Sequence, residues 1–197
     1  MKGICFVEPL FHAVIEGRKT QTRRIIKPQP VFFGNVKYTV SQLSNGKIIV
    51  HDDYDEDNML ESLTPRYSVG EMVYLKEPYH VDNDGFIYYN YAPHIVMDYE
   101  PLKWQNKLFM PERAARYFIE ITEVRVERLN EISDDDCIKE GIFEHHSFTW
   151  DDEHYYPSPR EAYAALIDKI NGKGTWESNP YVFVYDFKFL KPETQNQ

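Results

Sequence analysis

The chain has 197 residues, of which 42% are hydrophobic and 27% charged, so it can build a folded core and does not fit a disordered chain. Its 22 Lys and Arg against 32 Asp and Glu give a net charge of −10 at pH 7, which argues against a protein that follows extended duplex DNA. Neither a membrane helix nor a signal peptide is visible, and two cysteines are too few for a disulfide framework. We therefore expect one cytoplasmic domain without a membrane partner.

The N-terminal segment predicts a strand followed by a helix. The apolar run at residues 2–7 is typical of a short strand, and the helix begins at Glu8-Pro9, where proline is well tolerated. Gly17 is the stop signal of this helix. One helix face is expected to be buried, because apolar residues recur at helical spacing at Leu10, Ala13 and Val14.

Residues 36–51 predict a β-hairpin, because Asn45-Gly46 is a strong tight-turn signal between two β-prone runs. The acidic stretch at 52–61 predicts a solvated loop instead. Two further strands are predicted at 72–76 and 86–91, before a long connection interrupted by prolines.

The second half of the chain predicts two long strands and two short helices. Residues 116–126 alternate as a strand whose phase slips near Glu123, as a β-bulge would cause. Residues 181–190 are strongly β-prone. Two helices with serine caps and glycine ends are predicted at 133–141 and 158–172. The later helix is expected to bury Ala162, Leu166, Ile167 and Ile170.

This pattern of many short strands and three modest helices predicts an α+β, mostly β fold, a small β-barrel decorated with short helices and insertions. Alternation of strands and helices is absent, and so is a glycine-rich phosphate fingerprint. A doubly wound nucleotide-binding fold is therefore not expected.

The strongest chemical signal is a basic cluster at residues 16–27. Five basic residues and one acid give it a local charge of +4. A concentrated positive spot in an acidic protein attracts a single anionic group, which suits a nucleotide, a nucleoside or a short single strand better than duplex DNA. The ligand-binding candidates are Gly17, Arg18, Arg23 and Arg24. The alternative is a solvated turn whose arginines pair with nearby acids.

Gly17, Lys19 and Arg24 form the pattern G-x-K-x-x-x-x-R, and in this pattern the chain resembles the ASCH family. The resemblance continues in a glycine-led strand at 67–74 and in the strand–helix unit at 118–141, which ends in Glu-Gly, as well as in a closing strand at 183–190. The family has a fold similar to the PUA domain, a small β-barrel associated with RNA. Longer members of this kind are found in bacteria, phages and prophages.

The resemblance also implies the domain organisation. It predicts a single PUA-like domain over residues 1–191, followed by a tail at 192–197. Insertions into this domain are expected around residues 31–65, 79–112 and 143–157.

One branch of the family removes the acyl group from N4-acetylcytidine. Matching its motif to this chain implies Lys19 as the proton acceptor, Thr22 as the nucleophile and Glu140 as the proton donor. The chemistry is reasonable, because a threonine hydroxyl needs a neighbouring base, and burial among like charges lowers the pKa of a lysine toward that role. Arg24, or N–H groups after Gly17, would stabilise the oxyanion. Lys19 and Thr22 would share a face on a helix but would point apart on a strand.

Two other groups of residues invite a function. His145 and His146 stand near an acidic stretch that ends in His154, but they lack the spacing that aims metal ligands at one point, so a polar insertion loop is favoured and no metal or cofactor is expected. Trp176 precedes the last strand and is a candidate for stacking on a base, whereas most aromatic residues on strands are expected in the core. Cys137 has no histidine nearby in sequence to activate it.

The sequence thus predicts a protein that binds RNA, a nucleotide or a modified nucleoside, with hydrolysis of an N4-acylated cytidine as its catalytic form. Two alternatives stay open. One is a non-catalytic interaction module, such as a phage accessory protein, and the other is an RNA-cleaving nuclease.

Overall fold

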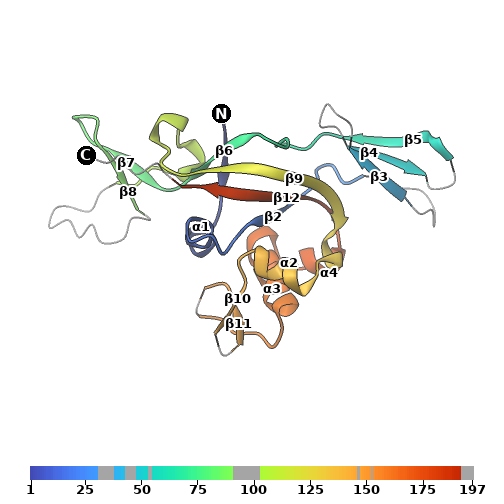
Figure 1. Cartoon of the computed structure of the whole chain (residues 1–197). Helices are drawn as coiled ribbons and strands as arrows, with labels where there is room; N and C mark the ends of the chain where they lie inside the picture. The colour runs from blue at the N-terminus through green and yellow to red at the C-terminus, as the bar shows by residue number, and fades with distance from the viewer. Residues whose placement is uncertain are drawn as a thin grey trace.

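The centre of the molecule is a five-stranded sheet in the order β1-β6-β9-β12-β2. Its strands are β1 (Lys2–Cys5), β6 (Met72–Lys76), β9 (Phe118–Arg128), β12 (Tyr181–Leu190) and β2 (Gln21–Ile25). Figure 1 shows β9 and β12 as the long strands in the middle of this sheet. The computed structural model describes residues 1–30, 38–42, 48–52, 55–90, 103–145, 147–151 and 153–191.

The β1–β6 pair is parallel, and the other neighbours in the sheet are antiparallel. Within the described ranges the two edge strands, β1 and β2, share no ladder, so the sheet stays open. A side chain connects these edges instead, because Arg24 on β2 donates a hydrogen bond to the carbonyl oxygen of Cys5 at 2.8 Å. The α+β, mostly β class is confirmed, whereas the expectation of a closed barrel is not met by these strands.

The predicted phase slip in the long strand is a bulge in β9. Asp186 of β12 pairs with Glu123, but the next residue, Phe187, pairs with Ile121, so one residue of β9 has no partner. A bulge of this kind bends a strand and restores its inward alternation. Ile121 and Val124, on either side of the extra residue, are accordingly both buried.

Four helices lie on one side of the sheet: α1 (Glu8–Ile15), α2 (Asp134–Lys139), α3 (Pro159–Asn171) and α4 (Thr175–Ser178) (Figure 1). The predicted caps are present, since the Ser133 hydroxyl accepts the N–H of Asp136 and the Ser158 hydroxyl accepts that of Glu161. Searching the described residues finds no helix that is both long and apolar enough to cross a bilayer.

The core lies between the sheet and helices α1 to α3. The expected buried faces are confirmed for Leu10, Ala13, Val14, Ala162, Leu166 and Ile167. Ile170 was expected to be buried and is 42% exposed. It stands in the last turn of α3, where the helix ends beside a cavity instead of packing against the sheet.

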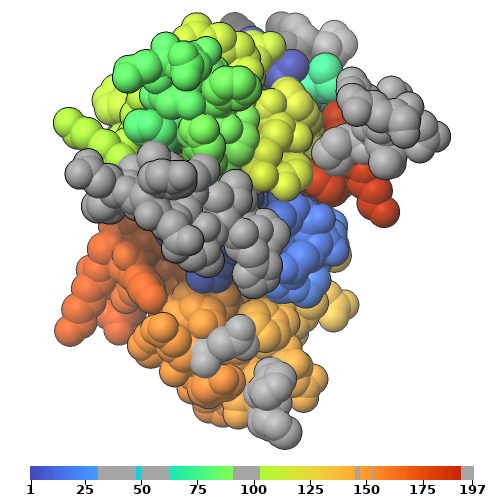
Figure 2. Space-filling view, turned by 90° about the vertical axis from the view of Figure 1, so that its left-hand side faces the viewer, coloured from blue at the N-terminus to red at the C-terminus, as the bar shows by residue number. Residues whose placement is uncertain are grey.

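Three smaller sheets arise within the segments predicted as insertions. They are formed by β3 (Tyr38–Gln42), β4 (Ile48–Asp52) and β5 (Asp55–Leu63), by β7 (Tyr79–Val81) and β8 (Ile87–Tyr89), and by β10 (Phe143–His145) and β11 (Ser147–Thr149). The first two extend beyond opposite ends of the central sheet in Figure 1. In Figure 2 the green hairpin β7–β8 lies at the top of the face shown, and the orange segment with β10 and β11 lies at the bottom.

The β3–β4 pair confirms the predicted hairpin, although its turn at 43–47 falls outside the described residues. The predicted tail at 192–197 also falls outside them. The prediction of a loop at 52–61 is wrong, because β5 pairs with β4 as the edge of its sheet. Backbone hydrogen bonds hold an edge strand in its sheet whatever the charge of its residues.

Candidate functional site

The basic segment runs from the end of α1 into β2. The N–H of Lys19 donates to the carbonyl oxygen of Ala13 in α1, and the N–H of Thr20 donates to that of Lys139 in α2, both at 2.9 Å. Lys19 therefore precedes the strand, held between two helices, and β2 begins two residues later at Gln21.

A cavity of about 260 Å³, which we call cavity A, brings together five of the predicted site residues. Its walls come from β1, α1, β2 and α3, from the connections on either side of α1, from the end of α2 and from Lys107. The lining consists of Cys5, Phe6, Val7, Leu10, Lys19, Thr22, Arg23, Arg24, Ile25, Lys107, Glu140, Tyr163, Leu166, Ile167, Ile170 and Asn171. It holds four cationic side chains and one carboxylate, in a protein whose net charge is −10.

Lys19 and Glu140 form a buried ion pair, with 1% and 5% of their side chains exposed. The Lys19 Nζ donates to the Glu140 carboxylate at 2.6 Å, to the Glu140 carbonyl oxygen at 2.6 Å and to the Gln21 carbonyl oxygen at 2.7 Å. Burial lowers the pKa of Lys19; the charge and hydrogen bond of Glu140 oppose this, and the charges of Arg24 and Arg23 lower it further. Lys19 and Glu140 are therefore joined by a short hydrogen bond in a buried environment.

The turn after α2 places Glu140 against Lys19. Glu140 is the C-terminal cap of α2, and Gly141 follows with φ +102, a conformation that favours glycine. A Cβ at position 141 would also lie 3.0 Å from Leu10 Cδ2 and 3.5 Å from Lys19 Cβ. Gly141 thus lets the turn pack closely against Leu10 and Lys19, and this packing places the Glu140 carboxylate beside Lys19.

Arg23 anchors the other carboxylate oxygen. Its Nη1 donates to Glu140 Oε1 at 3.2 Å and to the side-chain oxygen of Gln21, and its Nη2 contacts Glu127 at 2.9 Å and Asp136 at 3.1 Å. Burial alone would lower the pKa of Arg23, but Glu140 and the other partners raise it. Arg23 is therefore a permanent cation that orients Glu140, and its side chain is 0% exposed.

Thr22 lines the same cavity from within β2, where it pairs with Tyr185 of β12, and it is 4% exposed. Lys19 reaches that cavity because it lies just before the strand, so the alternation that separates neighbouring strand residues does not apply to this pair. Both residues therefore face one space, and that space also holds Glu140.

Arg24 and Tyr163 contribute unsatisfied polar atoms. The Arg24 guanidinium lies 5.4 Å from the centre of the Phe6 ring, and its Nε is buried without a partner among the described residues. The Tyr163 hydroxyl is also buried without a partner in that part of the chain, and burial raises its pKa well above the usual value. A buried hydroxyl that lacks a partner costs free energy, so a ligand in the cavity is an obvious candidate to supply one.

Tyr163 is the functional candidate that the sequence reasoning missed. It belongs to the apolar face of α3, where the helical spacing predicts only packing. No local signal in the sequence distinguishes a core tyrosine whose hydroxyl has a hydrogen-bond partner from one whose hydroxyl has none.

Three predicted ligand-binding residues lie outside cavity A. Gly17 ends α1 with φ +79, and Arg18 pairs with Glu16 at 2.5 Å with 40% of its side chain exposed, which agrees with the solvated-turn alternative for that residue. Trp176 is half-buried behind the cavity, with its ring edge-on to Tyr163 at 6.2 Å.

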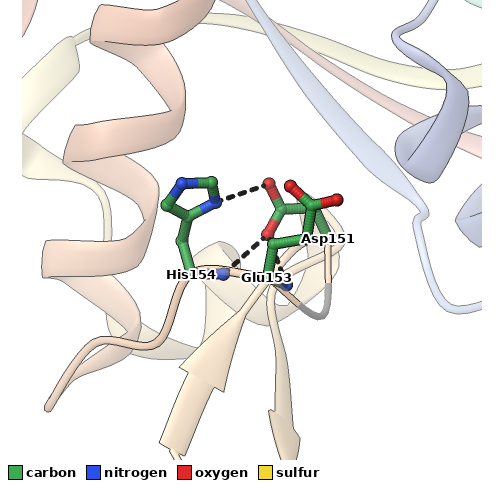
Figure 3. A group of neighbouring side chains, drawn as sticks. All are labelled: Asp151, Glu153 and His154. Atoms are coloured by element: carbon green, nitrogen blue, oxygen red, sulfur yellow. Dashed lines mark hydrogen bonds and ion pairs between the residues drawn. The ribbon is translucent and has the colours of Figure 1, made fainter.

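Figure 3 shows the group of residues that most resembles a metal site, Asp151, Glu153 and His154, whose ligand atoms lie within 4.8 Å of one another. The Asp151 carboxylate already accepts the N–H groups of Glu153 and His154 at 3.1 Å each, and Lys169 Nζ lies 3.3 Å from it. These contacts account for the cluster as a capped polar loop. His146 and the side chain of His145 fall outside the described part of the chain.

Comparisons of the chain with protein-family models, with curated proteins and with solved structures each found no match. The candidate site therefore rests on the residues and geometry of this chain.

Proposed function

We propose that cavity A is a hydrolase site that removes an acyl group from the exocyclic nitrogen of cytosine, in a PUA-like, ASCH-related protein that binds a nucleoside, a nucleotide or short single-stranded RNA. One observation carries the proposal: Lys19, Thr22 and Glu140 line a single cavity, with Lys19 and Glu140 joined by a 2.6 Å hydrogen bond. These are the three residues that the resemblance to the amidohydrolase branch implies.

The buried pair can generate both catalytic groups at once. If one proton moves from Lys19 to Glu140, the ion pair becomes a neutral amine beside a neutral carboxylic acid. Burial lowers the pKa of Lys19, which favours the neutral amine. The amine is then a base for the Thr22 hydroxyl, and the acid is a proton donor for the leaving nitrogen.

The proposed acylation step balances in atoms and protons. Thr22 Oγ1 attacks the acyl carbonyl carbon while its proton passes to Lys19. The carbon–nitrogen bond then breaks as Glu140 protonates the nitrogen, which leaves cytosine with its amino group and an acyl ester on Thr22. Lys19 and Glu140 end this step as an ion pair.

Hydrolysis of the ester reverses these roles. A water molecule attacks the ester carbon and gives its proton to the Glu140 carboxylate, and Thr22 leaves with a proton from the Lys19 ammonium. The Arg24 guanidinium, which lines the cavity and whose Nε has no described partner, would stabilise the oxyanion in both steps.

The size of cavity A supports a small ligand. Drug-sized ligands generally occupy cavities of about 300–1,000 Å³, and cavity A is slightly smaller at about 260 Å³. A single base with its acyl group is therefore favoured over a longer stretch of nucleic acid inside this cavity.

Turnover of N4-acetylcytidine by purified protein tests the proposal, with cytidine and acetate separated by chromatography. We expect Thr22→Val, which keeps the shape but lacks the hydroxyl, to lose at least about 10³-fold in kcat, whereas Thr22→Ser keeps a nucleophile and measurable turnover. Equal rates for the wild type and Thr22→Val would contradict the assignment, as would the absence of product at high enzyme concentration.

A second candidate, ligand binding without catalysis, is favoured by the three acceptors around Lys19 Nζ, because they match the three donors of an ammonium. In that case the wild type would bind nucleotides without turnover, and Thr22→Val would bind them equally well.

A further inference from the structure

A second and larger cavity, which we call cavity B, adjoins cavity A between the unpaired edges of β1 and β2. Its volume is about 650 Å³, and it shares Cys5, Arg24 and Ile25 with cavity A. Arg24 therefore stands in the wall between the two cavities, where its Nη2 donates to the Cys5 carbonyl oxygen at 2.8 Å.

Cavity B has the charge expected for an anion site. Four cationic residues line it, Arg24, Lys27, Arg66 and Lys76, and its lining includes no carboxylate. None of the four forms an ion pair with a described residue. In a chain of net charge −10, such a concentration of unneutralised cations attracts anions to one place.

The inner cations are held in position by carbonyl groups, which leave their charge unneutralised. Lys76 Nζ donates to the Leu108 carbonyl oxygen at 2.7 Å, and two of its three ammonium donors remain available. Lys27 and Arg66 are exposed residues of the lining. An anion that enters cavity B can therefore contact both the inner cations and the exposed ones.

The aromatic floor of cavity B adds no negative charge. Tyr67 and Tyr185 pack edge to face with ring centres 5.3 Å apart, and both are buried. Burial raises the pKa of Tyr67 and raises that of Tyr185 to about 12, so both rings stay neutral at pH 7. Their hydroxyl groups are engaged with the Gly3 carbonyl oxygen and the Arg66 N–H.

We propose that cavity B binds the phosphate of a nucleotide whose base occupies cavity A. The position of the base rests on the proposed function, whereas the cations of cavity B stand independently of it. Lys and Arg side chains form strong charge-assisted hydrogen bonds to phosphate oxygens. The substrate class is thus a phosphorylated cytidine, as a nucleotide or within short single-stranded RNA, and the free nucleoside is the poorer ligand.

The test measures binding alone. Fluorescence anisotropy would give the Kd of a labelled RNA pentamer with a central, unacylated cytidine, for the wild type and for Lys27→Ala/Arg66→Ala. The control is Lys173→Ala/Lys188→Ala, which removes the same charge from exposed residues outside both cavities. Unlabelled cytidine monophosphate and cytidine would compete with the pentamer.

We expect the cavity B variant to bind the pentamer at least about tenfold more weakly. The slope of log K against log[salt] should also be shallower by about 1.4, because binding by this variant releases fewer counterions. The control variant should stay within about twofold of the wild type. Cytidine monophosphate should compete better than cytidine, and this preference should shrink in the cavity B variant, which keeps only Arg24 and Lys76 of the four cations. If the monophosphate competes as strongly as the unlabelled pentamer, cavity B binds a terminal phosphate. If the pentamer competes more strongly, cavity B binds a phosphate within the RNA strand.

Equal losses in both double variants, or equal competition by cytidine and its monophosphate, would overturn the inference. These outcomes are separate from those for hydrolysis. Turnover of N4-acetylcytidine without a preference for the monophosphate would support the hydrolase proposal and contradict the phosphate site. Binding through Lys27 and Arg66 without turnover would support the phosphate site and contradict the hydrolase proposal.

Discussion

Two groups of charged side chains in this molecule contain similar residues in very different surroundings. The Lys19–Glu140 pair is almost fully enclosed, whereas Lys169 and His154 beside Asp151 have 60% and 53% of their side chains exposed. Water screens the second group, and each of its contacts contributes little. In the first group, contacts with the protein replace most of the contacts with water. Enclosure in a shared cavity, more than residue type or proximity, therefore distinguishes the candidate site.

The largest expected difference between the two groups is in stability. Lys19→Met leaves Glu140 buried without its closest cation, which should lower the free energy of unfolding by about 3–5 kcal/mol. Lys169→Met removes a cation of the same kind from the exposed cluster and should cost less than about 1 kcal/mol. Urea denaturation of both variants measures the contrast, and similar losses would show that burial is not the deciding difference.

The next comparison concerns satisfied and unsatisfied polar groups. Asp151 has partners for its oxygens, but the buried Tyr163 hydroxyl has none among the described residues. We expect Tyr163→Phe to raise stability slightly while reducing kcat/KM or ligand affinity by about tenfold, the loss of one hydrogen bond to a ligand. Thermal melting and kinetics on the same samples test both parts, and lower stability with unchanged activity would assign Tyr163 a purely structural role.

The smallest expected effects are two rises of stability with pH, one in the alkaline range from Lys19 and one in the acid range from Asp151. Burial lowers the pKa of Lys19, so from that lowered value up to 10.5 the unfolded chain holds more protons and stability rises with pH. Burial alone would raise the pKa of Asp151, but the N–H groups of Glu153 and His154 outweigh it and lower the pKa below 3.8. Its contribution is therefore present above pH 3.8 and is lost as pH falls through the folded value.

Denaturation curves from pH 3 to 10 for the wild type, Lys19→Met and Asp151→Asn would separate these trends. The rise at high pH should vanish only in Lys19→Met, and the acid loss should shrink only in Asp151→Asn. A rise at high pH that survives in Lys19→Met would mean that another group causes it.

Local patterns predicted most of the central elements, since capping serines, glycine stops and strand alternation act over a few residues. The bulge near Glu123 was visible in the same way, as a slip in alternation. The acidic strand β5 was missed because its charge argues for solvent, while its backbone pairing with β4 depends on a neighbouring strand. The sequence also could not predict that the sheet is open, because this depends on whether the edge strands β1 and β2 pair with each other.

The candidate site shows the same division. Lys19, Thr22 and Glu140 were implied by the resemblance to the ASCH family, because each stands at a matching place in its motif. Tyr163 and the cations of cavity B could not be found in this way, since Arg66 and Lys76 approach Arg24 only through the edges of the sheet. Residues from distant segments meet only in the folded structure, and no local pattern in the sequence marks them.

The pairing of β2 with β12 has a consequence for synthesis of the protein. The strand that carries Thr22 finds its sheet neighbour at Tyr181–Leu190, and cavity A also needs α3. A ribosome must therefore release nearly the whole chain before the cavity can form, and this long-range closure should make folding slow. A truncated product of interrupted translation would carry the basic segment without cavity A.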